Sequence, residues 1–207
     1  MFRDRAEAGE RLAEAVARAA PRDPVVLALP RGGVPLGRAV AARLGAPLDL
    51  VFVRKIGVPG QPEIAAGALV DEIEVFNEDV LRAEGLDRAE FRDQIDRLRA
   101  ENAARRGRYG CAPLPVAGRT AILVDDGIAT GASIRAALRA TRAAGARAVW
   151  IAVPVGPAET VAELGRMADR VICLEQPLPF RAVGLHYRDF GQVSDAEVID
   201  LLRDRPV

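Results

Sequence analysis

Short apolar runs alternate with amphipathic segments along most of this chain of 207 residues. The runs are rich in Val, Ile, Leu and Ala, which is typical of strands buried on both faces of a parallel sheet. They lie at residues 24–29, 48–56, 121–124, 148–153 and 170–174. The segments between them favour helices, at residues 4–19, 34–44, 131–144 and 158–165. The alternation predicts an α/β fold, doubly wound around a mainly parallel sheet of five strands.

Polar residues and glycines mark the ends of several predicted helices. Asp4, with Glu7 three residues later, has the spacing of an N-cap for the first helix. Gly45 and Gly145 follow the ends of two others, where a left-handed backbone is common. The segment 194–197 has the Ser-x-x-Glu pattern of a capping box and predicts a last helix that runs to about residue 203.

Residues 57–118 interrupt the alternation and look like an insertion between the second and third strands. Apolar residues at 64–70 and 74–76 predict a small hairpin that turns near residues 71–72. Residues 79–108 are charged and strongly helix-forming. We therefore expect one domain over residues 1–207 that carries a hairpin and helical insertion.

The helical part of the insertion has its own capping box and apolar stripe. Asp87 with Glu90 three residues later predicts the start of its longer helix. A stripe with helical spacing follows, formed by Phe91, Ile95, Leu98 and Asn102. The remaining surface of this helix is of mixed charge, which indicates a solvated element packed on the body rather than a binding face. A Pro-containing linker, residues 111–118, leads back to the sheet.

Composition and charge exclude several classes of protein. The 29 basic and 29 acidic residues cancel, which argues against nucleic-acid binding through bulk charge. No apolar run approaches the roughly 18 residues of a membrane span, and the charged, amphipathic N-terminus is not a signal peptide. Cys111 and Cys173 belong to no CxxC pair, so we expect thiols and a cytoplasmic location. With His186 as the single histidine, a zinc site is not favoured.

The segment 122–133 carries the strongest chemical signal. An apolar strand ends at two adjacent carboxylates, Asp125 and Asp126, and a loop of small residues leads into the next helix. Backbone N–H groups and hydroxyls can converge there on an anion. The residues of this cradle are Ala129, Thr130, Gly131, Ala132 and Ser133. The carboxylates suit a neutral diol or a metal ion beside the anion cradle. A sugar phosphate fits both parts of the segment, with its hydroxyls on the carboxylates and its phosphate in the cradle. A simple turn with an N-cap explains single residues of the string but not the whole.

Two further loops carry basic residues after predicted strands. Arg31, Gly32 and Gly33 follow the first strand and combine bare backbone N–H groups with a guanidinium that matches phosphate. A tight turn between strand and helix is the alternative explanation, and the glycine spacing is not that of a dinucleotide fingerprint. Arg54 and Lys55 follow the second strand and are either pyrophosphate contacts or solvated.

The string from Val124 to Gly131, Val-Asp-Asp-Gly-Ile-Ala-Thr-Gly, resembles the phosphoribosyl pyrophosphate (PRPP) signature of the type I phosphoribosyltransferases. The resemblance covers the β-α core, residues 24–56 and 119–175. It implies that Asp125 and Asp126 hold the ribose hydroxyls and that residues 129–133 wrap the 5-phosphate. It also implies that Arg31, Gly32, Gly33, Arg54 and Lys55 lie at the pyrophosphate.

The resemblance also implies a small hood after the fifth strand, at residues 176–207, that covers the acceptor base. Four ring-bearing residues cluster there: Phe180, His186, Tyr187 and Phe190. Stacking on a planar base, for which Tyr187 is the candidate, and simple packing of a hydrophobic hood are both compatible with this cluster.

The implied activity moves the 5-phosphoribosyl group of PRPP to a nitrogen acceptor, a nucleobase by analogy, and releases pyrophosphate. Mg²⁺ is the implied cofactor, bound mainly through PRPP and water. PRPP and a base are the expected partners, with neither nucleic acid nor membrane. A PRPP- or nucleotide-sensing regulator is the alternative. A phosphoaspartyl receiver also has an acidic pair at a sheet edge, but it leaves the small-residue loop unexplained.

The insertion is expected to divide into a mobile and a fixed part. Residues 57–67 contain three glycines and two prolines and have little to bury, so they are expected to move over bound PRPP and exclude water. The charged helix at residues 87–106 is expected to be an ordered outer element that could form part of a homodimer contact.

Overall fold

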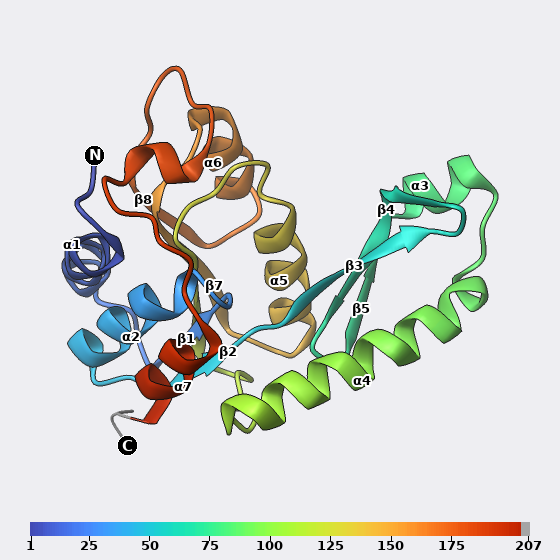
Figure 1. Cartoon of the computed structure of the whole chain (residues 1–207), viewed down its shortest axis with the longest axis horizontal. Coiled ribbons are helices and arrows are strands. Elements are labelled where there is room, and N and C mark those ends of the chain that lie inside the picture. The colour runs from blue at the N-terminus through green and yellow to red at the C-terminus, as the bar shows by residue number, and fades with distance from the viewer. Residues whose placement is uncertain (204–207) are drawn as a thin grey trace.

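The main sheet of the computed structural model, which describes residues 1–203, has five parallel strands in the order β2-β1-β6-β7-β8 (Figure 1). Its strands are β1 (Pro24–Ala28), β2 (Leu48–Leu50), β6 (Thr120–Val124), β7 (Ala148–Val155) and β8 (Arg170–Glu175). β1 pairs with β2 on one side and with β6 on the other, and Ala28 lies opposite Val124. The prediction of a doubly wound sheet is confirmed. The switch between β1 and β6 is where such sheets bind ligands.

Helices cover both faces of the main sheet because alternate strand residues point to opposite sides. Val26 packs in a core with α1 (Arg5–Arg18), α2 (Gly33–Leu44) and α7 (Asp195–Arg203). Val25 and Leu27 pack on the other side with α5 (Ala132–Ala143) and α6 (Ala158–Gly165). The predicted caps are present, since Asp4 accepts from Glu7 N at 2.8 Å and Gly45 is left-handed.

The predicted second strand, residues 48–56, is not one strand but two. β2 ends at Leu50, and β3 (Val53–Val58) belongs to a separate antiparallel sheet with β4 (Gln61–Val70) and β5 (Ile73–Phe76). Val51 and Phe52 between them are buried, so the apolar run continues while the chain changes sheets. The insertion therefore begins before residue 57. The predicted hairpin that turns at residues 71–72 is confirmed as β4 and β5.

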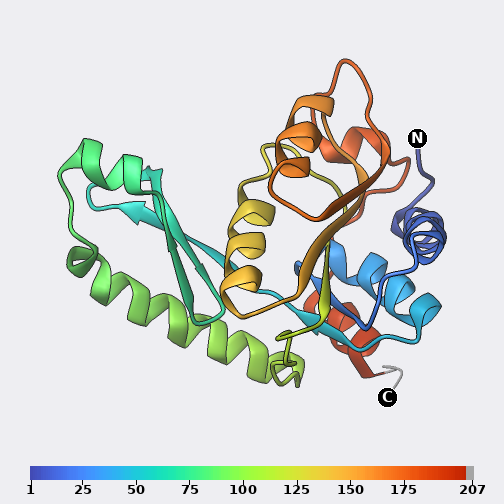
Figure 2. The same ribbon diagram turned by 180° about the vertical axis from the view of Figure 1, so that it is seen from behind.

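The small sheet projects from the body as an arm, residues 53–109, together with three helical segments (Figures 1 and 2). These are α3 (Glu78–Glu84), the 3₁₀ helix η1 (Arg88–Phe91) and α4 (Arg92–Tyr109). The capping box at Asp87 and Glu90 is present and opens η1. Phe91 and Ile95 of the predicted stripe are buried with Leu69 and Phe76, so the arm has a small core of its own.

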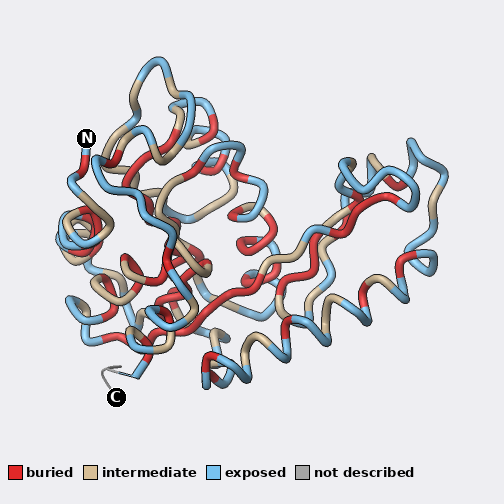
Figure 3. Tube along the Cα trace, in the orientation of Figure 1, coloured by how far each residue is buried: buried red, intermediate tan, exposed pale blue. Residues whose placement is uncertain are grey.

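A buried ion network ties the base of the arm to the main sheet. Arg106 of α4 meets Asp49 of β2 at 2.9 Å and Asp71 of the β4–β5 turn at 2.8 Å. Its Nη2 also donates to the carbonyl oxygen of Leu50 at 2.9 Å. Figure 3 shows buried segments on both sides of this junction, residues 48–52 in the body and 56–58 in the arm, with half-buried and exposed residues 53–55 between them. The network therefore fixes the position of α4 against the end of β2.

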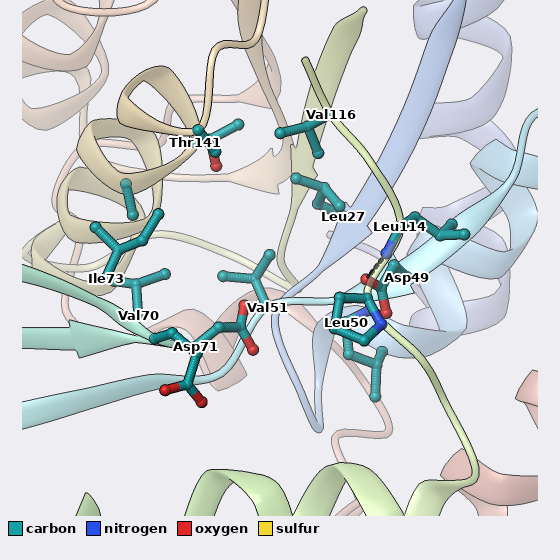
Figure 4. A pocket seen from close by; sticks show the side chains of 14 residues that line it. Leu27, Asp49, Leu50, Val51, Val70, Asp71, Ile73, Leu114, Val116 and Thr141 are labelled. Carbon is teal, nitrogen blue, oxygen red and sulfur yellow. Dashed lines mark hydrogen bonds between the residues drawn. The ribbon is translucent and has the colours of Figure 1, made fainter. Parts of the chain in front are cut away.

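An apolar cavity of about 240 Å³ lies beside this network, between the arm and the C-terminal half of α5 (Figure 4). Leu27, Val70 and Val116 contribute to its walls, and Asp49 accepts from the backbone N of Leu114 at its rim. None of the site residues predicted from the sequence lines it. Within residues 1–203, no helix is both long and apolar enough to cross a membrane.

Candidate active site

The acidic loop, residues 125–131, leaves the carboxyl end of β6 and leads into α5. Asp126 N donates to Asp125 Oδ1 at 2.9 Å, and Ile128 N donates to the carbonyl of Val155 at 2.8 Å, which anchors the loop to β7. Burial, and then the charge of Asp126, raise the pKa of Asp125 well above its ordinary value. Repulsion between two adjacent carboxylates makes it costly for both to be ionised at once. Hydroxyl groups, which donate hydrogen bonds to a carboxylate, suit this pair.

The loop ends in an open helix start. Gly131, the N-cap residue, is left-handed, with φ of 74°, and has no side chain to cap α5, while Thr130 Oγ1 accepts from the backbone N of Ala132 at a long 3.5 Å. Ala129, Thr130, Ala132 and Ser133 are exposed around this turn. Backbone N–H groups at a helix start, together with exposed hydroxyls, form a receptor for a tetrahedral anion.

The glycine loop, residues 30–33, lies directly against the acidic loop. A Cβ on Gly32 would stand 2.0 Å from Asp126 Oδ2, and one on Gly33 would stand 2.5 Å from the carbonyl oxygen of Val124. A side chain at position 33 would meet backbone that cannot shift, and one at position 32 would displace the carboxylate of Asp126. Neighbouring strands thus bring together the two motifs that the sequence analysis singled out, with Arg31 at the rim.

Arg5 is a site residue that the sequence analysis missed. Its Nε and Nη2 lie 2.9 and 2.8 Å from Asp126 Oδ2, and its guanidinium stacks 3.9 Å from the centroid of the Phe190 ring. Both partners of the Arg5–Asp126 pair are largely buried, with 13% and 15% of the side chain exposed. The residue lies in the first turn of α1, and no local pattern distinguishes it from the other arginines.

Tyr187 lies beneath the acidic loop rather than over a binding cleft. Its hydroxyl donates to the carbonyl oxygen of Asp126 at 2.6 Å, and its ring packs between Phe2 and Phe190. The residue is only 5% exposed, and burial raises the pKa of its phenol far above the ordinary value. Of the two alternatives that the sequence left open, stacking of Tyr187 on a base does not fit this position, whereas packing within the hood does. The ring and hydroxyl instead support the acidic loop.

Arg54 and Lys55 do not lie together, although the sequence analysis placed both at the same edge. They are consecutive residues of β3, so their side chains point to opposite faces of the small sheet. Arg54 pairs with Glu101 of α4 and shares a pocket with Arg31. Lys55 lines a cleft of about 670 Å³ between the arm and α5, with Ser133 on the facing wall. Only Arg54 therefore joins the glycine loop.

The acidic pair could bind a magnesium ion that keeps most of its water ligands. No group of three or more His, Cys, Asp or Glu side chains within residues 1–203 could enclose a metal. Asp125 and Asp126 nevertheless offer adjacent oxygens beside the cradle. Mg²⁺ commonly uses one or two carboxylates and completes its shell with water and substrate phosphates. These residues fit such an ion.

Comparison with known proteins identifies the family of this fold. The family model described as "Phosphoribosyl transferase domain" matches residues 3–189. A putative phosphoribosyl transferase of Mycobacterium tuberculosis is 48% identical over 206 residues, which are 98% of this chain and 46% of that protein. The chain thus spans about half the length of the curated relatives it matches.

Solved structures extend the likeness to three dimensions. The crystal structure of TT1426 from Thermus thermophilus has a TM-score of 0.86 and 44% identity, and the match covers 97% of each chain, arm included. A hypothetical protein from Neisseria gonorrhoeae with bound ppGpp has a TM-score of 0.50 at 13% identity, over 98% and 97% of the two chains, which shows the fold alone. From the family match and these likenesses, the chain belongs to the phosphoribosyl transferase domain family.

Proposed function

We propose that this chain binds PRPP and transfers its 5-phosphoribosyl group to a nitrogen acceptor, a nucleobase or similar ring, with release of pyrophosphate. The observation that carries the proposal is the contact between the two loops, where Gly32 leaves room for the carboxylate of Asp126. One ligand can therefore touch the acidic pair, the helix start and the glycine loop together. PRPP has a diol, a phosphate and a pyrophosphate at matching positions.

In the proposed reaction each loop has its own task. Asp125 and Asp126 accept from the ribose hydroxyls, and the N–H groups of residues 129–133 hold the 5-phosphate. At the anomeric carbon, the acceptor nitrogen forms a C–N bond as the C–O bond to pyrophosphate breaks, and pyrophosphate leaves with the electron pair. Arg31 and Arg54 stabilise the charge that develops on the leaving group. Most of the rate enhancement comes from positioning and electrostatics.

Asp125 and Asp126 are the residues that would hold Mg²⁺ together with the bound PRPP. When bound, the ion would neutralise charge on the leaving pyrophosphate. Arg5 keeps Asp126 in place through two contacts to one oxygen, and Tyr187 fixes the backbone at the same residue. The acidic pair is therefore held in position before a ligand arrives.

The proposal places the protein in nucleotide metabolism in the cytoplasm, where the thiols of Cys111 and Cys173 suit reducing conditions. Its partners are PRPP and a base, without nucleic acid or membrane, and the exposed arm is the candidate for a homodimer contact. The test is pyrophosphate release from PRPP and Mg²⁺ with a panel of purine, pyrimidine and small aromatic bases. Release with one base supports the transferase, whereas PRPP binding without release would identify the sensing protein instead.

Sulfate or phosphate is expected to occupy the start of α5. Backbone donors at a helix start bind tetrahedral anions whatever their parent molecule. The N-cap residue of this helix, Gly131, has no side chain, and Thr130 Oγ1 contacts Ala132 N only at a long 3.5 Å. A crystal grown in ample sulfate should show the anion on the N–H groups of residues 129–133, and sulfate should compete with PRPP in solution. An accessible but empty loop in such a crystal would speak against the 5-phosphate assignment.

Hydrogen exchange should identify the part of the arm that responds to PRPP. Residues 57–67, which are expected to move over bound PRPP, lie in the β3–β4 hairpin, with register shifts beside Gly57 and an exposed turn at Gly60. Ala65 and Gly67 line the cleft opposite Ser133, so the hairpin borders the proposed phosphate site. PRPP with Mg²⁺ should increase protection mainly in residues 57–67 and change it much less over residues 87–106 as a whole. The reverse pattern would make the helix the mobile cover.

A further inference from the structure

A strongly basic pocket lies where the arm meets the glycine loop. Four arginines from three elements line it: Arg31, Arg54 of β3, and Arg105 and Arg108 of α4. Its volume is about 470 Å³, within the range of roughly 300–1,000 Å³ that is usual for small-ligand sites. Glu101 and Asp195 are the two carboxylates of its lining, so positive charge remains in excess. That excess stands out on a chain with a net charge of zero.

Both carboxylates of the pocket already hold its arginines. Asp195, at the start of α7, lies 3.5 Å from Arg31 and 3.1 Å from Arg108 through its two oxygens. Glu101 pairs with Arg54. About a third of the Asp195 side chain and half of the Glu101 side chain are exposed. Pairs this exposed hold their partners weakly, so a stronger anion can replace them.

The arrangement of four arginines around the pocket favours a condensed phosphate over a single carboxylate. Guanidinium groups bind phosphate oxygens through two parallel hydrogen bonds. Arg31 is next to Gly32, which touches the carboxylate of Asp126. The arginine pocket is therefore joined to the acidic loop through the glycine loop. An anion in this pocket lies on the side of the glycine loop that faces the arm.

We propose that Arg105 and Arg108 of α4 complete, with Arg31 and Arg54, the site that takes the pyrophosphate group of PRPP. In the free protein the carboxylates of Asp195 and Glu101 occupy this site as internal anions, and pyrophosphate displaces them. The assignment rests on the proposed function and extends it, because it gives the outer helix of the arm a direct part in binding. Lys55, on the other face of β3, is outside this site.

Titration of the full chain with inorganic pyrophosphate and Mg²⁺ at low salt tests the assignment. The variant Arg105→Ala/Arg108→Ala should bind pyrophosphate roughly tenfold more weakly, from the loss of two charged contacts. Its affinity for ribose 5-phosphate should stay within about twofold, because that ligand uses the acidic loop. The matched control is Arg92→Ala/Arg97→Ala, which removes two exposed arginines of the same helix outside the pocket.

A second variant is expected to raise the affinity for pyrophosphate. Asp195→Asn keeps the shape of the side chain and an acceptor for the Tyr109 hydroxyl, which donates to it at 2.7 Å, but removes the competing charge. It should bind pyrophosphate several-fold more tightly than the unsubstituted protein. A merely structural role for these residues would not tighten binding.

Equal pyrophosphate affinity in the folded Arg105→Ala/Arg108→Ala variant and its control would overturn the assignment. If the unsubstituted protein still bound PRPP and ribose 5-phosphate, the proposed function would survive that result. Equal loss of pyrophosphate and ribose 5-phosphate binding would also overturn it, since the whole site would then be damaged. An unsubstituted protein that bound pyrophosphate but neither PRPP nor ribose 5-phosphate would contradict the proposed function itself.

Discussion

Replacing Asp125 and Asp126 together by asparagine should weaken PRPP binding by a factor of roughly 10² to 10⁴. Each carboxylate is proposed to accept from ribose hydroxyls, and a hydrogen bond to a charged group contributes about 1.5–3 kcal/mol. The amide keeps the shape of the side chain, so the loop contacts of Ile128 and Tyr187 remain available. Calorimetric titration with PRPP and Mg²⁺ measures the effect directly.

The control for this variant is Asp79→Asn/Asp96→Asn, which changes two highly exposed carboxylates of the arm. It should leave PRPP affinity unchanged. Because Asp126 also pairs with Arg5, thermal unfolding of the double variant must show that the protein remains folded at the titration temperature. Unchanged PRPP affinity in the folded double variant would remove the assignment of the acidic pair.

Arg106→Met should destabilise the protein by about 3–5 kcal/mol, which is the usual effect of removing one partner of a buried ion pair. The substitution leaves Asp49, which is 3% exposed, and the partly buried Asp71 without their shared cation (Figure 4). Burial already raises the pKa of Asp71 despite the nearby Arg106. Desolvation at this site is therefore strong, and two uncompensated charges would oppose docking of the arm.

Urea unfolding of Arg106→Met, with exposed Arg97→Met as the matched control, measures this loss. Arg97→Met should lie within about 0.5 kcal/mol of the unsubstituted protein. Adding Asp71→Asn to Arg106→Met should recover part of the lost stability because it removes one of the unpaired charges. A loss below about 1 kcal/mol for Arg106→Met would mean that the network does not hold the arm in place.

The β-α core could be predicted from the sequence because its signals are local. Unbroken apolar runs identified the strands, and the caps at Asp4, Asp87 and Ser194 marked helix starts that the structure confirms. The meeting of the two loops followed from topology, since the carboxyl ends of neighbouring parallel strands share an edge. The change of sheet at Val51 and Phe52 could not be predicted, because both residues are buried and the apolar pattern does not break there.

The contacts of the acidic loop, and the proposed pyrophosphate pocket, that sequence reasoning missed depend on contacts between distant elements. Arg5 reaches Asp126 across 121 positions of the chain, from a helix whose pattern indicates only an amphipathic surface element. Tyr187 belongs to a ring-rich cluster in which the sequence cannot distinguish a stacking ring from a buried one. Arg105 and Arg108 look solvated on the helix until the fold brings Arg31 and Asp195 beside them.

We propose that one molecule of PRPP spans the acidic loop, the start of α5 and the glycine loop. A crystal structure of the full chain with PRPP and Mg²⁺ would show whether it does. In that structure the 5-phosphate should lie on the N–H groups of residues 129–133, the ribose hydroxyls on Asp125 and Asp126, and the pyrophosphate beside Arg31 and Gly32. PRPP bound elsewhere, or with its phosphate and pyrophosphate ends exchanged, would contradict it.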